Sequence, residues 1–517
     1  MFIAITLSLL LVTAISLIVL RIYRPDFNYA WPLALIGSLL AWISTFLWQI
    51  GMPHRLVIFS YAFKDVYNYS INLVADGTNF PYALGLTSLA VAVILVSAMQ
   101  ARNINPMGWV NIFILSVLGL LAVLADNPLT LVIAWSLIDI AGLLSALRAV
   151  DEPHLSGRAV LSYSARVMGT GILLWAGVLG SSRGGAFEFS SIPPGAGLLI
   201  LLGVLLRLGS MLIHLPYSKD PSLRGEYDTS FYLVSAAASL IVLTHLTMGA
   251  SRPLASTFMT VIIAVIGLLT TFNWLRSSEE LTRQPYWITG VASLAIAAAL
   301  QGNPIGSAAW GSACLFAGGL LFLFSARKRW LTIILLVAAF SLSALPFSLT
   351  ATGWVGNPSS WLPLLLLLPL QGLLISSYVR SVARQGGDNL DDKPIWVRIF
   401  YPLGLILLMA TGLLLGIAGW AGAGQIGAWI PGAIASLIAL ILSILLVRMP
   451  LPTSGDSRFL QRPTALVDST AAVFWGLFRS IRGLLELLST IFEGDGGFLW
   501  TILLLVVFIS LLGGLIR

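Results

Sequence analysis

Long apolar segments, separated by short polar connections, run along nearly the whole chain. A membrane-spanning helix needs about 20 mostly apolar residues, and the sequence contains sixteen segments of this kind. They lie near residues 1–22, 31–51, 81–99, 106–125, 128–148, 158–181, 195–214, 228–249, 254–275, 284–302, 306–325, 330–350, 359–379, 396–418, 425–447 and 496–515. The pattern predicts an all-α membrane protein with about 16 transmembrane helices. The first segment begins at Met1 without a basic region, so we expect a retained span and not a cleaved signal.

Two stretches depart from this pattern. Residues 52–80 are rich in aromatic and β-branched residues, which predicts two short strands and a turn. Residues 449–495 form a long segment between the last two spans, and from Asp468 its charged side chains fall on one stripe of a helix. An amphipathic helix along the inner membrane surface is expected there.

The composition agrees with a membrane protein. Hydrophobic residues make up 58 % of the chain and charged residues 9 %, and the mean hydropathy is +0.94. With the N-terminus outside, 21 of the 28 Lys and Arg residues fall in inner loops, five fall outside, and Arg166 and Arg207 lie in spans. This bias predicts an outer N-terminus and an even number of spans. The net charge of +7 is therefore a topology signal and not the footprint of nucleic-acid binding.

Motifs for cofactors are missing from the sequence. Cys314 is the single cysteine, and the four histidines are scattered without the spacing of metal ligands. The chain has no Walker loop or dinucleotide fingerprint. We expect no metal, no cofactor and no catalytic site in this chain.

One span carries an isolated charge. The stretch from Leu201 to Pro216 contains Arg207 among apolar residues, followed by Gly209 and His214. A charge at the centre of a membrane helix costs ~2.5–3.5 kcal/mol on insertion scales, so it usually faces a protein interior or a water path. Gly209 and Pro216 predict a broken helix, and Pro346 predicts a second break. Proline kinks between packed helices and a purely structural arginine are the alternatives.

Several motifs, in order along most of the chain, resemble those of the antiporter-like membrane subunits. This family includes the proton-translocating subunits of respiratory complex I, Mrp Na+/H+ antiporter subunits and membrane-bound hydrogenase subunits. The motifs are Asp76-Gly77 before the third span, LADNPLTLVIAWSLIDIAGLL at 124–144, Ser164 to Val167, Leu206 to Pro216, Ala313 to Gly318 and Ser343 to Ser348.

The resemblance implies a fold of two inverted five-helix repeats, each with one broken helix. It divides the chain into N-terminal spans with an outer hairpin (1–105), a first repeat (106–249), a second repeat (254–379), additional spans (396–448), the inner amphipathic helix (449–495) and a C-terminal span (496–517). Partners would be the lipid bilayer and other integral membrane subunits, in a prokaryotic plasma membrane. The helix within 449–495 would either brace a neighbouring subunit or simply lie on the membrane.

The chain departs from the family at the positions that move protons. The family uses a glutamate in span five, lysines in later spans, and histidines. Here Ser136, Gly169, Ser235 and Ser312 stand at former proton-path positions, and Arg207 replaces a lysine. All four lysines lie in loops, and arginine stays protonated. We therefore predict an incomplete proton path, with no charged group in the spans between Pro253 and Val447.

Three charged residues of the first half lie at one depth. Counting ~1.5 Å of rise per residue, Asp139, Arg166 and Arg207 are each about 12–13 Å from the inner helix ends. We predict an ion pair between Asp139 and Arg207, completed by Arg166 or a water, with His214 near the inner mouth. The two cations should keep the carboxylate ionised. Alternatively, Asp139 faces a partner subunit.

Three functions remain open from the sequence. The favoured one is a divergent, non-pumping subunit of a complex-I-like assembly, of the NADH:quinone oxidoreductase, hydrogenase or Mrp type. The second is an active proton or cation translocator that uses Asp139 and Arg207. The third is an unrelated multi-pass transporter or membrane enzyme.

Overall fold

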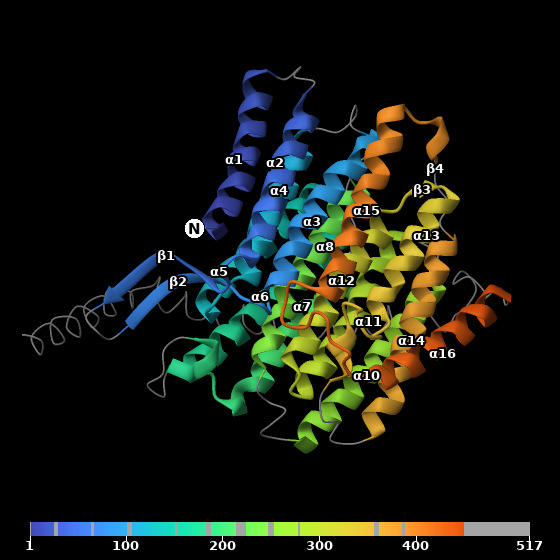
Figure 1. The fold of residues 1–517 in the computed structure, drawn as a ribbon. Helices are drawn as coiled ribbons and strands as arrows, with labels where there is room; N and C mark the ends of the chain where they lie inside the picture. The colour runs from blue at the N-terminus through green and yellow to red at the C-terminus, as the bar shows by residue number, and fades with distance from the viewer. Residues whose placement is uncertain are drawn as a thin grey trace, which may run out of the picture. The chain divides into compact units, whose positions relative to one another are not determined.

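The protein is an all-α membrane protein (Figure 1). The computed structural model describes residues 2–24, 29–63, 67–100, 106–149, 153–181, 188–213, 224–246, 253–277, 280–355, 361–384 and 388–448. Within these ranges eleven helices are long and apolar enough to cross a membrane. All of these residues belong to the first of two compact units, Met1–Thr453; the second is Ser454–Arg517.

The described ranges contain fifteen α-helices, which coincide one by one with the first fifteen predicted spans. They are α1 (Phe2–Tyr23), α2 (Ala30–Phe46), α3 (Phe80–Val96), α4 (Pro106–Val123), α5 (Pro128–Ala149), α6 (Pro153–Ser181), α7 (Gly197–Ile213), α8 (Arg224–Leu240), α10 (Pro253–Arg276), α11 (Glu280–Leu300), α12 (Pro304–Leu323), α13 (Arg329–Ala338), α14 (Trp361–Arg384), α15 (Ile395–Ile417) and α16 (Trp429–Arg448). The predicted amphipathic helix and the sixteenth span lie outside the described residues. The count of sixteen and the inverted repeats stay predictions.

Three helices form the centre of this unit. Every residue of α3 is buried, α12 is buried from Gly306 to Leu323, and most of α8 is buried. A helix that is apolar on all sides is stable only when other helices surround it. In Figure 1 these helices lie between α1 and α2 on one side and α13, α14 and α16 on the other. Glycines permit the close packing, as where Gly311 of α12 faces the ring of Tyr82 on α3.

A β-hairpin, β1 (His54–Phe63) and β2 (Tyr67–Ala75), confirms the two strands predicted in residues 52–80. Its base is fixed to the turn between α4 and α5, where the backbone N–H of Val74 donates to the carbonyl of Leu124 at 2.8 Å. The side chain of Asn127 donates to the Ser70 carbonyl at 2.7 Å and caps α5 by accepting from the Thr130 N–H. A second, minimal pair is parallel, β3 (Ala326–Arg327) with β4 (Asp388–Asn389).

The helix break predicted at Pro346 falls in a non-helical segment. Helix α13 ends at Ala338 and continues as a short 3-10 turn, Ala339–Leu342. Residues 343–350 are not helical, and a second 3-10 turn follows at Ala351–Trp354. Two residues in the break, Ala344 and Phe347, have positive φ angles of 55° and 61°. Such angles are uncommon for residues other than glycine, so surrounding contacts must hold this backbone.

Buried side chains supply those contacts. The Thr350 hydroxyl donates to the Ser341 carbonyl at 2.7 Å and accepts from the Ala344 N–H at 3.0 Å. The Gln371 amide of α14 donates to the Leu342 carbonyl at 2.8 Å. Irregular backbone at membrane depth is tolerated only where protein groups satisfy it, and these two side chains do so.

The break predicted across Gly209–Pro216 does not begin at Gly209. Helix α7 is continuous from Gly197 to Ile213, and Gly209 lies inside it. A glycine within a helix costs only about 1 kcal/mol relative to alanine, whereas backbone groups freed in hydrocarbon cost several. The helix therefore persists through Gly209. Pro216 lies outside the described residues.

Gly311 and Gly209 give a matched pair of substitutions. We expect Gly311→Ala to destabilise the protein by about 1–3 kcal/mol, because the new methyl group would overlap the Tyr82 ring. Gly209→Ala should leave stability unchanged or raise it by up to about 1 kcal/mol, since no atom lies within 4 Å of the added carbon. Thermal unfolding in detergent measures both, and a larger loss at Gly209 would contradict this account.

Candidate functional site

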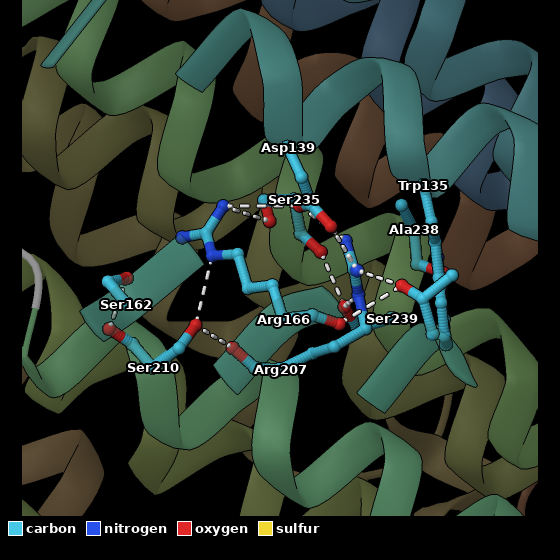
Figure 2. A network of polar contacts seen from close by, with 10 residues as sticks. Trp135, Asp139, Ser162, Arg166, Arg207, Ser210, Ser235, Ala238 and Ser239 are labelled. Atoms are coloured by element: carbon cyan, nitrogen blue, oxygen red, sulfur yellow. Dashed lines mark hydrogen bonds and ion pairs between the residues drawn. The ribbon is translucent and has the colours of Figure 1, made fainter. Parts of the chain in front are cut away.

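Three charged side chains from consecutive helices meet inside the first half of the protein. Asp139 comes from α5, Arg166 from α6 and Arg207 from α7, and Figure 2 shows them converging. Their exposed fractions are 2 %, 4 % and 0 %. Charges this deeply buried are maintained only with partners, so their arrangement is the main candidate for a functional site.

The Asp139 carboxylate receives the planar fork of the Arg207 guanidinium. Nη1 donates to Oδ2 at 2.6 Å and Nη2 donates to Oδ1 at 2.9 Å. The guanidinium also lies over the indole ring of Trp135, 4.1 Å from its centre, and donates to the Thr170 hydroxyl at 3.0 Å. Two parallel charge-assisted hydrogen bonds are the strongest form of such a pair. The ion pair expected between these residues is therefore present.

Arg166 is the second cation around the same carboxylate. Its Nη1 lies 3.6 Å from Asp139 Oδ1, and its Nε donates to the Ser210 hydroxyl at 2.9 Å. The guanidinium is 5.1 Å from the centre of the Phe231 ring on α8. Asp139 is thus held between two arginines.

Hydroxyl groups of α8 close the cluster on its far side. Arg166 Nη1 donates to the Ser235 hydroxyl, and Arg207 Nε donates to the Ser239 hydroxyl, both at 3.4 Å. The indole N–H of Trp135 donates to the Ala238 carbonyl at 2.8 Å and connects α5 directly to α8. These neutral groups extend the hydrogen bonding of the arginines without adding charge.

The four neutral positions noted in the sequence have different surroundings. Ser235 belongs to the cluster. The hydroxyls of Ser136 and Ser312 donate to carbonyls of their own helices, those of Val132 and Ala309.

Gly169 has a packing role. A Cβ atom at this position would lie 2.7 Å from the Gly203 carbonyl oxygen and 3.0 Å from Arg207 Cγ. The glycine therefore permits the close approach of α6 and α7.

Several residues of the cluster were not anticipated from the sequence, among them Trp135, Thr170, Ser210 and Ser239. A signal for the first three exists, because Trp135 lies four residues before Asp139, Thr170 four after Arg166, and Ser210 three after Arg207. Residues spaced by three or four share a helix face. His214, the fourth residue predicted in the network, lies outside the described residues.

The second half is not free of buried charge, which corrects the prediction of spans without charge. Helix α14 runs to Arg384, so Arg380 lies inside it and is 7 % exposed. The helix extends beyond the apolar segment because an arginine can bury its aliphatic stem. The Nη1 atom of Arg380 makes no hydrogen bond with the described residues.

The described residues do not bring three His, Cys, Asp or Glu side chains together as a metal site would require. The lone cysteine, Cys314, is buried in α12 beside the indole of Trp287. The polar contacts of the first-half cluster are those of an ion pair and its supporting hydroxyls.

Comparison with known proteins gives the fold. No protein-family model matches the sequence, and no curated protein matches it. The structure is similar to a chain of the Mrp complex from Dietzia sp. DQ12-45-1b (TM-score 0.69, 16 % identity). It is also similar to a chain of an archaeal membrane-bound sulfane sulfur reductase (TM-score 0.60, 13 % identity) and to one of respiratory complex I from Thermus thermophilus (TM-score 0.55, 18 % identity).

The chain has the antiporter-like membrane-subunit fold. The match to the Mrp chain covers 100 % of this protein. It covers 63 % of the length of the Mrp chain, so this protein spans less than two thirds of it. The match to the reductase covers 97 % of this protein and 99 % of the other, and the match to complex I covers 81 % and 100 %. The resemblance noted in the motifs is therefore confirmed as a likeness of fold.

Substitutions of Asp139 and Arg207 should destabilise the protein by different amounts. Asp139→Asn leaves two buried arginines without a carboxylate and should cost about 3–5 kcal/mol. Arg207→Gln should cost less, because Arg166 still faces Asp139 at 3.6 Å. The double variant should recover part of the loss. Thermal unfolding of the full chain in detergent measures each value.

An exposed ion pair provides the control. Lys328 lies 2.5 Å from Asp391, with exposed side-chain fractions of 33 % and 54 %, and its hydrogen bond holds the pKa of the Asp391 carboxyl below the usual value. Asp391→Asn should leave the stability nearly unchanged, because water and salt screen an exposed pair. If Asp139→Asn were no more harmful than Asp391→Asn, the buried cluster would have no structural importance.

Proposed function

We propose that this chain is a non-pumping antiporter-like subunit of a larger membrane assembly, one comparable to the Mrp complex, the sulfane sulfur reductase or complex I. The likeness of fold supports the comparison with subunits of such assemblies. The pairing of Asp139 with two buried arginines carries the non-pumping part of the proposal.

A proton relay needs a group that both takes and releases a proton near neutral pH. Arginine remains protonated at any physiological pH. Protonating Asp139 would remove the carboxylate between Arg166 and Arg207 and leave two buried cations facing each other. Such a step costs several kcal/mol. The cluster therefore serves as a fixed electrostatic connection between α5, α6 and α7.

The second half offers no replacement relay within the described helices. Helices α10 to α16 contain no lysine or histidine, and their single acidic residue, Glu280, is the first residue of α11. Buried serines and threonines pass hydrogen bonds but do not hold a charge. Beyond Glu280 at the start of α11, a proton entering at Asp139 would reach no carboxylate, lysine or histidine in these helices.

A second candidate function is proton or cation translocation through hydroxyls and internal water. Buried polar atoms without a hydrogen bond to the described residues favour it, including the hydroxyls of Tyr82, Ser377 and Tyr378. Such atoms usually bind ordered water when space permits. In this alternative, Asp139 would be the loading site.

The repeat boundaries and orientation belong to the same proposal. Among the described residues, 106–249 include the five helices α4 to α8, and 254–379 include the greater part of the five helices α10 to α14. Equal numbers of helices support two repeats. The distribution of basic residues supports an outer N-terminus in a prokaryotic plasma membrane.

Purification and transport together test the proposed function. When the chain is purified in mild detergent, we expect other integral membrane subunits to co-purify with it. Alone in liposomes it should not sustain proton or sodium exchange above the level of empty vesicles, as followed with a pH-sensitive dye. Asp139→Asn serves as the matched control. Exchange that depends on Asp139 would favour the translocator, and exchange that persists without it would show that the path lies elsewhere.

Orientation has a separate test. A reporter domain fused after Arg329 should lie on the inner side of the membrane, because the basic run 327–329 is expected to remain there. A reporter fused after Gly356 should lie on the outer side. The reverse result at both sites would overturn the topology.

A further inference from the structure

The charges of the buried cluster do not balance. Asp139 carries one negative charge, whereas Arg166 and Arg207 carry two positive charges. Each nitrogen of the Arg207 guanidinium donates to a side chain, and four of its five N–H groups are paired, with Asp139, Thr170 and Ser239. The excess therefore resides on Arg166.

One nitrogen of Arg166 has no partner among the described residues. Its Nη2 is buried and makes no hydrogen bond with any of them, while Nε and Nη1 donate to serine hydroxyls. In Figure 2 the end of this guanidinium points away from Arg207. A buried donor without an acceptor costs about 1–3 kcal/mol, and more when it is charged. A negatively charged hydrogen-bond acceptor beside Nη2 would remove this cost and balance the excess charge.

A groove between α5 and α6 leads to this nitrogen. Gly142 and Ala146 line it from α5, Ala159 and Tyr163 line it from α6, and Arg166 lies at its deep end. The groove is partly open to its surroundings, and the space in it that a water-sized particle can occupy is about 10 Å³, room for about one such particle. Its walls are mainly small or apolar side chains, and two charged groups line it among the described residues, Arg166 and the Asp139 carboxylate that is already paired with Arg207.

The dimensions of the groove favour a small ligand. Arg166 lies seven residues from Ala159, about 10 Å along the axis of α6. An acidic side chain from a protein packed at the Ala159 end would not extend that far. The groove has room for about one water-sized particle, so a small monovalent anion is the ligand that would neutralise the single excess charge.

We propose that Arg166 binds a small inorganic anion of the halide class, which enters along the groove between α5 and α6. The anion accepts a hydrogen bond from Nη2 and brings the net charge of the cluster to zero. This inference concerns the chain itself and does not depend on the proposed function, because it requires neither transport nor a partner subunit.

Thermal unfolding of the full purified chain tests the site, with sodium chloride or bromide replacing sodium gluconate at constant ionic strength. Gluconate is too large for the groove. A ligand bound only by the folded state raises Tm with a saturating dependence on concentration, and we expect a rise of about 2–4 °C with either halide. Arg166→Gln should abolish this rise.

Two further variants make the test specific. Arg276→Gln removes another arginine that contacts a phenylalanine ring, Phe272 at 5.4 Å, but lies outside the groove, so it should keep the full halide response. Ala146→Leu narrows the groove without touching Arg166 and should weaken the response even if Arg166→Gln fails to fold.

Three results would overturn the proposal. They are an equal response to gluconate and chloride, a halide response that survives in both Arg166→Gln and Ala146→Leu, and a chain that gains stability from a partner subunit but never from halide. The last result would mean that a carboxylate of another protein neutralises Arg166.

Discussion

A carboxylate buried between two arginines determines how the first half of this protein is assembled. Asp139, Arg166 and Arg207 each come from a different helix, and none is more than 4 % exposed. In hydrocarbon, a charge is stable only beside its counter-charge. Helices α5, α6 and α7 must therefore pack in the one arrangement that brings the three side chains together. Gly169 contributes by letting α6 and α7 approach closely enough for Arg207 to reach Asp139.

The second half satisfies the same constraint largely with neutral groups. The break after α13 frees carbonyls and N–H groups that water cannot reach, and Thr350 and Gln371 provide their hydrogen bonds. The two halves thus solve one physical problem by different chemistry. An ion pair ties three helices together in the first, whereas uncharged side chains hold an irregular backbone in the second.

The helices can be predicted from the sequence because the bilayer fixes their length. About 20 apolar residues are needed to cross it, so the apolar segments alone locate the fifteen described helices. Counting residues from the helix ends also brings Asp139, Arg166 and Arg207 to one depth. This estimate works because a helix rises by a constant amount per residue. The supporting residues cannot be foreseen in the same way, since Thr350 and Gln371 look like ordinary polar residues near apolar spans.

The sequence by itself determined the class of the protein, the order of its helices and the identity of its buried charges, because these depend on local hydropathy and constant helix geometry. Only the tertiary structure decided which polar residues act together. Helix α7 stays regular through Gly209, whereas the segment around Pro346 is irregular and Thr350 and Gln371 supply hydrogen bonds to its backbone. Arg380 became a buried charge because α14 extends beyond its apolar stretch. The surroundings of Arg166, whose Nη2 has no partner among the described residues, depend on three other helices, and contacts between distant segments are not encoded in any local pattern.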